Sequence, residues 1–308
     1  MSKVIRSTAI IGSNWGLTYL RPLRERGIQP KLLVGQDPAQ LAVIAKREGF
    51  SGFSTNVVDA LDCDLVIVAS PADSHSAMLS QLDGPSLICE KPLLGTRSPQ
   101  HSLPAHADQL WVNYAFPQLQ TAQLAAQHLG ELGTVSKVKL RSAVNLPLQF
   151  TLEQWILETS SHPLAWLLHQ FGEPRLLKRR SYARQLELQF ACGDTELELS
   201  FSLSGFEGIY HHLELVGSTG NMQFSGYYYP GQAWQYRPVI LNGRPLNQGE
   251  YSDSDCWLDA NNRNVQLMID QFEGRLSRTQ ARRQGLFDVE RALWLDKLMT
   301  TPCPVSLT

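Results

Sequence analysis

The sequence has little that would suggest a membrane, an oxidising compartment or a nucleic acid as its partner. Its five cysteines are scattered and never form a C-x-x-C pair, so neither a disulfide framework nor a zinc knuckle is expected. No apolar run approaches the ~20 residues that a membrane helix needs, and the segment Met1–Arg6 carries no signal-peptide pattern. The 27 basic and 29 acidic residues leave no positive surplus for a phosphate backbone. We therefore expect a cytoplasmic protein that acts on a small molecule.

The first third of the chain alternates short apolar runs with helical patterns, which is typical of β-α-β units. Strands are expected over residues 7–11, 31–35, 65–69, 86–89 and 109–113, and helices over 16–26, 38–48 and 74–82. This order predicts a doubly wound, parallel Rossmann sheet of the kind that binds a dinucleotide.

After about Phe116 the pattern changes to strands with clear alternation, such as 185–190 and 196–201, between helices at 119–129, 256–272 and 286–299. We predict an NAD(P)-binding domain over residues 1–116. An α+β domain with a mainly antiparallel sheet should cover 117–308 and serve substrate binding and oligomerisation. The C-terminal helices could also pack back on the first domain.

The turn between the first strand and first helix reads Gly12, Ser13, Asn14, Trp15, Gly16. A dinucleotide fingerprint, G-x-G-x-x-G, uses its glycines for a tight turn and for close approach to the pyrophosphate. Here Asn14 replaces the second glycine and Gly16 comes one residue early. The flanking strand and helix favour cofactor binding over a plain glycine turn.

Asp37 closes the second expected strand, where an acid would bind the ribose 2′-hydroxyl of NAD. Pro38 follows it, so Asp37 could instead cap the next helix. We favour the cap and therefore NADP slightly over NAD, while keeping Asp37 among the candidate cofactor residues.

Two motifs follow the third and fourth strands: Ala-Ser-Pro-Ala-Asp-Ser-His at 69–75 and Cys-Glu-Lys-Pro-Leu at 89–93. With them the sequence resembles the glucose-fructose oxidoreductase, inositol dehydrogenase and rhizopine catabolism (Gfo/Idh/MocA) family. Segments 130–133 and 214–220 extend the resemblance over essentially the whole chain.

The resemblance implies a nicotinamide-dependent dehydrogenase whose Lys91 lies beside the nicotinamide and the reacting oxygen of the substrate. There a cation stabilises a developing alkoxide or passes a proton; a plain surface lysine is the alternative. Ser70, Pro71, His75 and Glu90 would belong to the cofactor site. Pro92 also invites a cis bond after Lys91, which sequence does not decide.

A second family motif, an acid four residues before a histidine, appears as Glu158 and His162. The resemblance implies that both meet the substrate and that His162 moves the proton, a role that suits imidazole. Pro163 should make Ser161 or His162 a helix cap, so Glu158 could fall outside the helix. Simple helix-start chemistry is the alternative for both.

The first domain also resembles the thiazolinyl imine reductases, which use NADPH, through Gly12, Gly16 and Tyr19-Leu20 and through Trp111-Val112-Asn113. The leading prediction is hydride transfer between NAD(P) and a sugar, cyclitol or related hydroxyl or carbonyl compound. The alternatives are an imine reductase of a biosynthetic pathway and a nucleotide-binding protein without turnover.

Two further patterns bear on metals and assembly. His211 and His212 are neighbours in an expected strand and point to opposite faces, so they cannot share a metal, and no metal site is expected. The alternating strands 185–190 and 196–201 give their sheet a polar rather than apolar outer face. Since family members commonly pair through this sheet, we expect a homodimer or a dimer of dimers.

Overall fold

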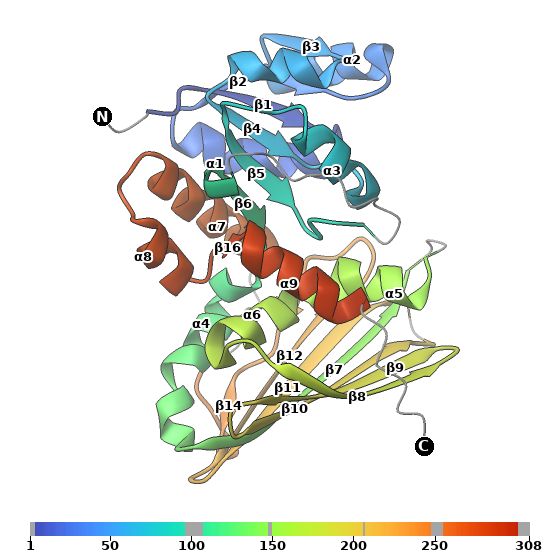
Figure 1. Cartoon of the computed structure of the whole chain (residues 1–308), viewed down its shortest axis with the longest axis vertical. Coiled ribbons are helices and arrows are strands. Elements are labelled where there is room, and N and C mark those ends of the chain that lie inside the picture. Colours follow the sequence, from blue (N-terminus) through green and yellow to red (C-terminus); the bar gives the residue numbers. More distant parts are fainter. Residues whose placement is uncertain (1–3, 96–106, 147–149, 206, 248–254, 301–308) are drawn as a thin grey trace. The chain divides into compact units, whose positions relative to one another are not determined.

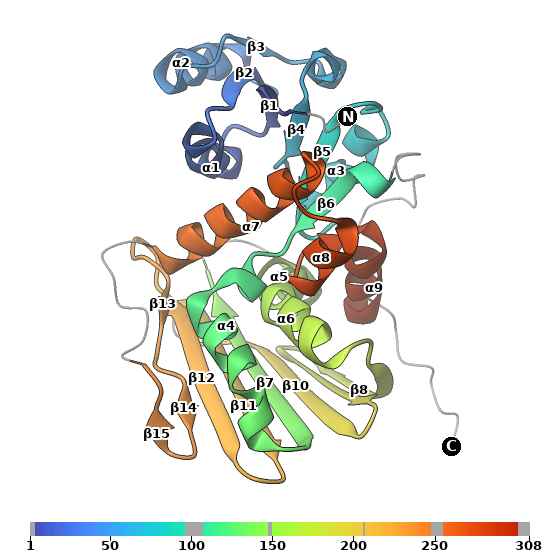
Figure 2. The same cartoon turned by 90° about the vertical axis from the view of Figure 1, so that its left-hand side faces the viewer.

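The computed structural model describes residues 4–95, 107–146, 150–205, 207–247 and 255–300. Contacts divide the chain into two compact units. The first comprises residues 1–114 and 261–296, and the second comprises 115–260 and 297–308. The chain therefore returns, after the second unit, to the unit in which it began (Figures 1 and 2).

The first unit is built on a seven-stranded sheet in the order β16-β6-β5-β4-β1-β2-β3. All neighbouring strands are parallel except β16, which runs antiparallel to β6. The predicted Rossmann-like sheet is confirmed (Figure 1). The strand bounds are β1 Ser7–Ile11, β2 Gln29–Val34, β3 Gly52–Ser54, β4 Leu65–Val68, β5 Ser86–Glu90, β6 Leu110–Asn113 and β16 Phe287–Asp288.

One face of this sheet packs on helices near both ends of the chain. Ile10, Ile67 and Ile88 of the strands share one buried cluster with Leu23 of α1 and Met268 of α7. Burial of this apolar surface is the main stabilising contribution to the unit. The helix bounds are α1 Leu20–Glu25, α2 Pro38–Glu48, α3 Ala72–Leu79, α7 Cys256–Phe272, α8 Arg278–Arg283 and α9 Val289–Thr300.

Two helix predictions need correction. The helix expected over residues 16–26 is a 3-10 turn, Trp15–Tyr19, followed by α1. Pro22 lacks a backbone N–H, so an α-helix accommodates it only in its first turn, and α1 accordingly begins at Leu20. The helix expected over 286–299 begins later, because Phe287 and Asp288 pair with β6 as strand β16. Helical spacing of apolar residues does not reveal such a short strand.

The second unit is built on a nine-stranded sheet that is antiparallel except where β10 runs parallel to β7. Its main path is β15-β14-β12-β11-β7-β10-β9-β8, and β13 pairs with β12. The strands are β7 Val135–Asn145, β8 Arg175–Tyr182, β9 Gln185–Cys192, β10 Thr195–Leu203, β11 Gly208–Gly217, β12 Asn221–Tyr228, β13 Gln235–Tyr236, β14 Ile240–Leu241 and β15 Arg244–Pro245. The helices are α4 Gln120–Gln127, α5 Leu152–Trp155 and α6 Ser161–Phe171.

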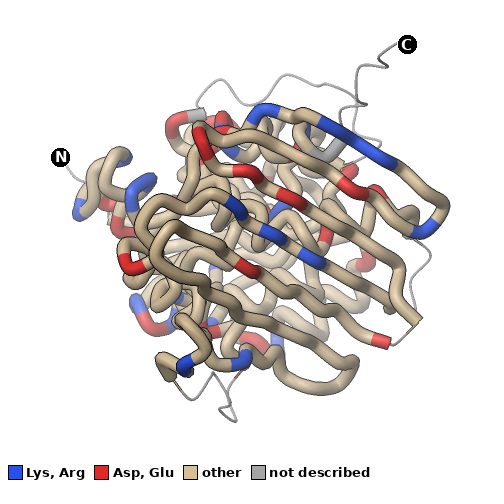
Figure 3. Tube along the Cα trace, turned by 90° about the horizontal axis from the view of Figure 1, so that it is seen from below, with Lys and Arg blue, Asp and Glu red and all other residues tan. Residues whose placement is uncertain are grey.

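The two faces of this sheet differ in polarity, as the alternation predicts. Leu188 of β9 and Leu199 of β10 are buried, and Phe224 of β12 packs edge-on against Trp166 of α6 with ring centroids 5.6 Å apart. Basic and acidic residues occupy many of the intervening positions along the strands (Figure 3). Among the described residues no helix is long and apolar enough to span a bilayer.

Candidate active site

The turn that begins at Gly12 runs very close to the strands beneath it. Gly12 has a φ of +116°, and a Cβ there would lie 2.4 Å from the carbonyl oxygen of Ala69. A Cβ at Gly16 would lie 2.7 Å from Cγ2 of Ile10. Glycine at both positions therefore lets the turn pack closely on β1 and on the end of β4. A dinucleotide-binding turn uses glycines for the same purposes, the tight turn and the close packing of the helix on the strand.

A buried hydrogen-bond network connects this turn to the loop after β5. Oε1 of Glu90 accepts hydrogen bonds from the indole Nε1 of Trp15, at 2.8 Å, and from the hydroxyl of Tyr19. Nδ2 of Asn113, at the end of β6, lies 2.9 Å from the same oxygen and 2.6 Å from the Tyr19 hydroxyl. Burial and the neighbouring Glu90 carboxylate raise the pKa of Tyr19 well above its ordinary value. Tyr19 therefore stays protonated and acts as a donor to Glu90.

The network continues into helix α7. Nδ2 of Asn113 lies 2.6 Å from Oδ1 of Asn261, and Nδ2 of Asn264 donates to Oδ1 of Asn113 at 2.8 Å. All three asparagines are buried. A buried polar group is costly unless it is paired, so each of these side chains constrains the others. Glu90 is thus fixed from three elements of the first unit.

Lys91 follows Glu90 directly, and hydrogen bonds hold the backbone on either side of it. The Lys91 N–H donates to Oε2 of Glu90 at 3.2 Å, and the Lys91–Pro92 peptide bond is cis. The Pro92 carbonyl oxygen lies 2.9 Å from Nδ1 of His75. Lys91 itself is half-buried, so part of its side chain is exposed while its backbone is held in place.

His75 joins two loops at the ends of neighbouring strands. Its Nε2 lies 2.8 Å from the carbonyl oxygen of Ser70, while Nδ1 faces Pro92. Pro71 immediately precedes helix α3, and the hydroxyls of Ser70 and Ser74 lie 2.8 Å apart. The His75 ring has no exposed surface. His75 therefore connects the loop at Ser70 to the loop that bears Lys91.

Asp37 caps helix α2. Its Oδ1 accepts hydrogen bonds from the backbone N–H groups of Ala39, at 2.9 Å, and Gln40, at 3.2 Å, with Pro38 at the first helical position. The sequence analysis favours this capping role of Asp37 over binding of a ribose hydroxyl. The same oxygen is therefore not available to a ribose hydroxyl.

Glu158 and His162 lie in the second unit, in helical structure without a break. Helix α5 passes into a π-helical turn, Ile156–Ser160, and then into α6. The expectation that Pro163 makes Ser161 or His162 the cap is wrong, because the cap position falls at Ser160 and no side chain fills it. Pro163 has no N–H to donate one turn back, and a wider π turn there accommodates the loss. Glu158, half-buried, lies within that turn rather than outside the helix.

The surroundings of His162 are strongly aromatic. Its ring packs edge-on against Trp257, with ring centroids 4.4 Å apart, and the ring centroids of Trp257 and Trp234 lie 5.5 Å apart. His211 stacks on Trp234 at 5.8 Å, and its Nδ1 lies 2.9 Å from the Ser142 hydroxyl. Burial lowers the pKa of His211 to about 3, so it is neutral at physiological pH. His162 is therefore part of an aromatic cluster with Trp257 and Trp234.

The structure thus places the predicted site residues in two groups, one in each unit. Gly12, Trp15, Gly16, Glu90 and Lys91 gather in the first unit, and Glu158 with His162 lie in the second. The sequence assigned no role to the buried polar residues that organise the first group, which are Tyr19, Asn113, Asn261, Asn264 and Asp296. A usable signal existed for the last three, because each is a polar residue on the apolar stripe of a helix.

Comparisons with known proteins agree with this geometry. Residues 6–110 match the family described as "Oxidoreductase family, NAD-binding Rossmann fold" (GFO_IDH_MocA). Among curated proteins none matches the chain.

Several solved structures share the fold at low sequence identity. A dehydrogenase (MviM) from Clostridium difficile has a TM-score of 0.72 and 11% identity, with 97% of this chain and 100% of that chain covered. GenD2 of gentamicin A biosynthesis, in complex with NAD, has a TM-score of 0.69 and 17% identity, covering 97% and 93%. Scyllo-inositol dehydrogenase from Lactobacillus casei, with NAD(H) and scyllo-inositol, has a TM-score of 0.69 and 15% identity, covering 96% and 95%.

The family match over residues 6–110, together with the Rossmann-like sheet, indicates the class of the protein: an oxidoreductase that uses a nicotinamide dinucleotide. Residues 6–110 match the model of the Gfo/Idh/MocA family, the resemblance that the Glu90-Lys91-Pro92 motif indicates from sequence alone.

Proposed function

We propose that this protein transfers a hydride between NAD(P) and a hydroxyl or carbonyl carbon of a small polar substrate, such as a sugar or cyclitol. The nicotinamide supplies or accepts the hydride when the cofactor is bound. Lys91 polarises the reacting oxygen, where a fixed cation stabilises developing negative charge. His162 transfers the proton, and Glu158 helps to hold the substrate.

One observation carries this proposal: Glu90 ties the turn at Gly12–Gly16 to the loop that bears Lys91. Trp15 and Tyr19 follow Gly12 and donate to Glu90, whose other oxygen accepts from the Lys91 N–H. Residues that would hold the phosphates and the residue that would meet the substrate oxygen thereby share one buried carboxylate. Precise placement of a catalytic group is what lowers a reaction barrier.

For the cofactor we propose NADP slightly ahead of NAD. The support is Asp37, whose Oδ1 is engaged in capping α2 and so is less available to grip a 2′-hydroxyl. Ser13 and Asn14 would lie along the phosphates. The test is fluorescence titration with NADPH and NADH. Both should bind, with NADPH equal or tighter; no binding at millimolar concentration would refute the proposal.

A second candidate function is imine reduction with NADPH. The observation that favours it is the aromatic wall beside His162, formed by Trp234 and Trp257. A polyol offers many hydroxyl groups to be satisfied, whereas a flat heterocycle stacks on aromatic rings. Steady oxidation of NADPH with a panel of keto sugars, keto cyclitols and cyclic imines separates the two. Turnover confined to imines would replace the leading proposal.

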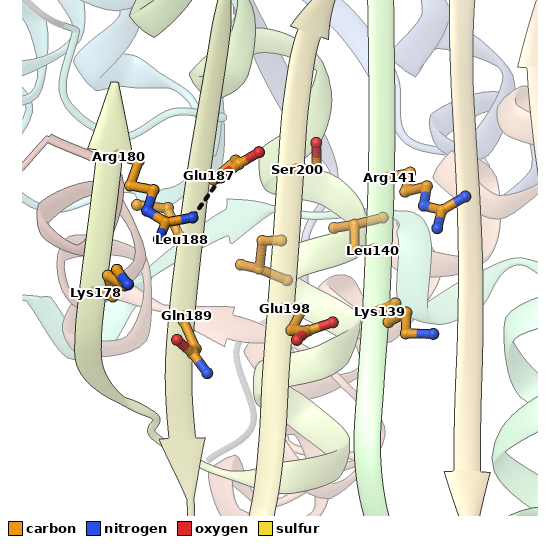
Figure 4. Close-up of a pocket in the computed structure, with 11 residues that line it drawn as sticks. Lys139, Leu140, Arg141, Lys178, Arg180, Glu187, Leu188, Gln189, Glu198 and Ser200 are labelled. Atoms are coloured by element: carbon orange, nitrogen blue, oxygen red, sulfur yellow. Dashed lines mark ion pairs between the residues drawn. The ribbon is translucent and has the colours of Figure 1, made fainter. Parts of the chain in front are cut away.

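We also propose that the protein forms a homodimer or a dimer of dimers through the outer face of the second unit's sheet. Basic residues Lys178 and Arg180 of β8 lie beside the acidic row on β9 and β10, and Lys139 and Arg141 of β7 follow it (Figure 4). These side chains line a pocket on the sheet. Alternating rows of opposite charge can meet their counterparts across a two-fold axis. Light scattering tests this, since a mass near 34.5 kDa would mean a monomer.

A further inference from the structure

Asp296 is an acid on the buried side of a helix. In α9 it follows Val289 and Ala292 at helical spacing, and all three are buried, with only 4% of Asp296 exposed. An apolar residue would be the ordinary choice at such a position, because burying a carboxylate is costly unless it is well paired. The presence of an acid therefore calls for a specific partner.

The partners of Asp296 belong to the loop that bears Lys91. Oδ2 of Asp296 accepts a hydrogen bond from the backbone N–H of Leu94 at 2.9 Å, and the Leu93 N–H is a second backbone donor. The hydroxyl of Tyr114 lies 3.2 Å from Oδ1. Since His75 faces the Pro92 carbonyl from α3, the loop is held at its backbone from two different helices. Asp296 thus fixes the segment that immediately follows Lys91.

The carboxyl group also acts on Lys91 through its charge. Burial raises the pKa of Asp296 to about 7, against the hydrogen bonds and the Lys91 charge, which lower it. The other titratable groups that face it are the Tyr114 hydroxyl and the buried Cys89 thiol of β5. Of these groups, Lys91 is the one that carries a positive charge.

We propose that Asp296 is a positioning residue for Lys91: its carboxylate anchors the loop of residues 91–94 through the backbone N–H of Leu94 and places a negative charge near the Lys91 ammonium group. The catalytic part of this inference rests on the role proposed for Lys91. The hydrogen bonds of Asp296 to the loop and its charge near Lys91 do not depend on that role, so the two parts can be tested separately.

The experiment measures the reactivity of Lys91 without any substrate. Asp296→Asn keeps the shape of the side chain and removes its charge. The protein is labelled with trace acetic anhydride, which reacts with neutral amines, and Lys91 is compared with exposed Lys46 by mass spectrometry. Loss of a nearby negative charge favours the neutral form of an amine. Lys91 should therefore react about threefold faster at pH 8 in the variant, while Lys46 does not change.

The dependence on pH separates charge from mere packing. The difference between wild type and Asp296→Asn should shrink as the pH falls through about 7, where Asp296 becomes neutral. Glu290→Gln, an exposed acid of the same helix, is the matched control and should leave Lys91 unaffected. An unchanged Lys91 rate, or a difference independent of pH, would overturn the proposal.

A second variant covers the case in which Asp296→Asn does not fold. Tyr114→Phe removes one donor from the carboxylate, so the pKa of Asp296 should rise further and the pH step in Lys91 reactivity should move upward. No such movement would count against the proposal.

Activity gives an independent arm once a substrate from the panel is turned over. Asp296→Asn should lower kcat about tenfold with cofactor affinity unchanged, and should add little to Lys91→Ala. An equal loss in both backgrounds would show that Asp296 acts through the fold alone, against the proposal. If Lys91 reactivity changes as expected but Lys91→Ala retains turnover, the proposed function fails and the positioning contact stands.

Discussion

Replacing Gly12 by alanine tests whether the turn at the end of β1 is as tightly constrained as its geometry indicates. The new Cβ would lie 2.4 Å from the Ala69 carbonyl oxygen, which is backbone, and Ala69 is itself fixed by its N–H bond to the Ile11 carbonyl at 2.8 Å. A positive φ costs an L-residue about 1–2 kcal/mol, and overpacking adds about 1–3 kcal/mol. We expect Gly12→Ala to lower the free energy of unfolding by about 3 kcal/mol, the upper range for single substitutions.

Gly27→Ala is the matched control, because Gly27 has a φ of +68° and a Cβ added there would meet no atom within 4 Å. It should cost only the backbone strain, about 1 kcal/mol. Urea unfolding measures both losses, and NADPH fluorescence measures binding, which Gly12→Ala should weaken at least tenfold, by about 1.4 kcal/mol. If Gly12→Ala were no worse than Gly27→Ala in stability and binding, the close approach of the turn would not be a real constraint.

Three further outcomes are expected. Lys91→Ala should lower turnover about 100-fold or more with cofactor affinity nearly intact; stopped-flow rates and titration decide it, and retained turnover would make Lys91 structural. Tyr19→Phe removes one donor from buried Glu90 and should cost about 1–2 kcal/mol in urea unfolding, whereas a neutral result would mean that Glu90 is satisfied without it. His211 has a pKa of about 3 in the folded protein and its ordinary value of 6.5 in the unfolded chain. Between these two pH values the unfolded state binds one more proton, so the free energy of unfolding falls as the pH falls from 6.5 towards 3. His211→Gln should flatten this pH dependence in urea unfolding, and an unchanged pH dependence would contradict the burial of His211.

The sequence by itself predicted five strands of the first sheet, β1, β2, β4, β5 and β6, and the candidate residues of the site. Local alternation of apolar runs with helices marks β-α-β units, and the predicted helix Pro38–Glu48 agrees with α2 because Asp37 and Pro38 are strong local start signals. Two further motifs are recognisable from a few adjacent residues: the glycines at 12 and 16, and Glu90-Lys91-Pro92.

The hydrogen-bond partners of the residues that organise the site could not be found this way, because the partners meet only after folding. Asn113 and Asn261 are far apart in sequence, and no local pattern tells that one amide will lie 2.6 Å from the other. The same holds for Asp296 and Leu94. In the second unit, a proline inside a helical pattern predicts a boundary, yet a π turn at Ile156–Ser160 absorbs it and keeps Glu158 in the helix.

The difference has a simple physical origin. Propensities, caps and turn glycines act over a few residues, so sequence specifies them directly. The pairing of buried polar groups depends on which distant segments the tertiary structure brings within hydrogen-bond distance, and each such group stays buried only because its partner is there. Sequence therefore identified Glu90 and Lys91 as candidates, and only the tertiary structure decided that Trp15, Tyr19, Asn113 and Asp296 hold them.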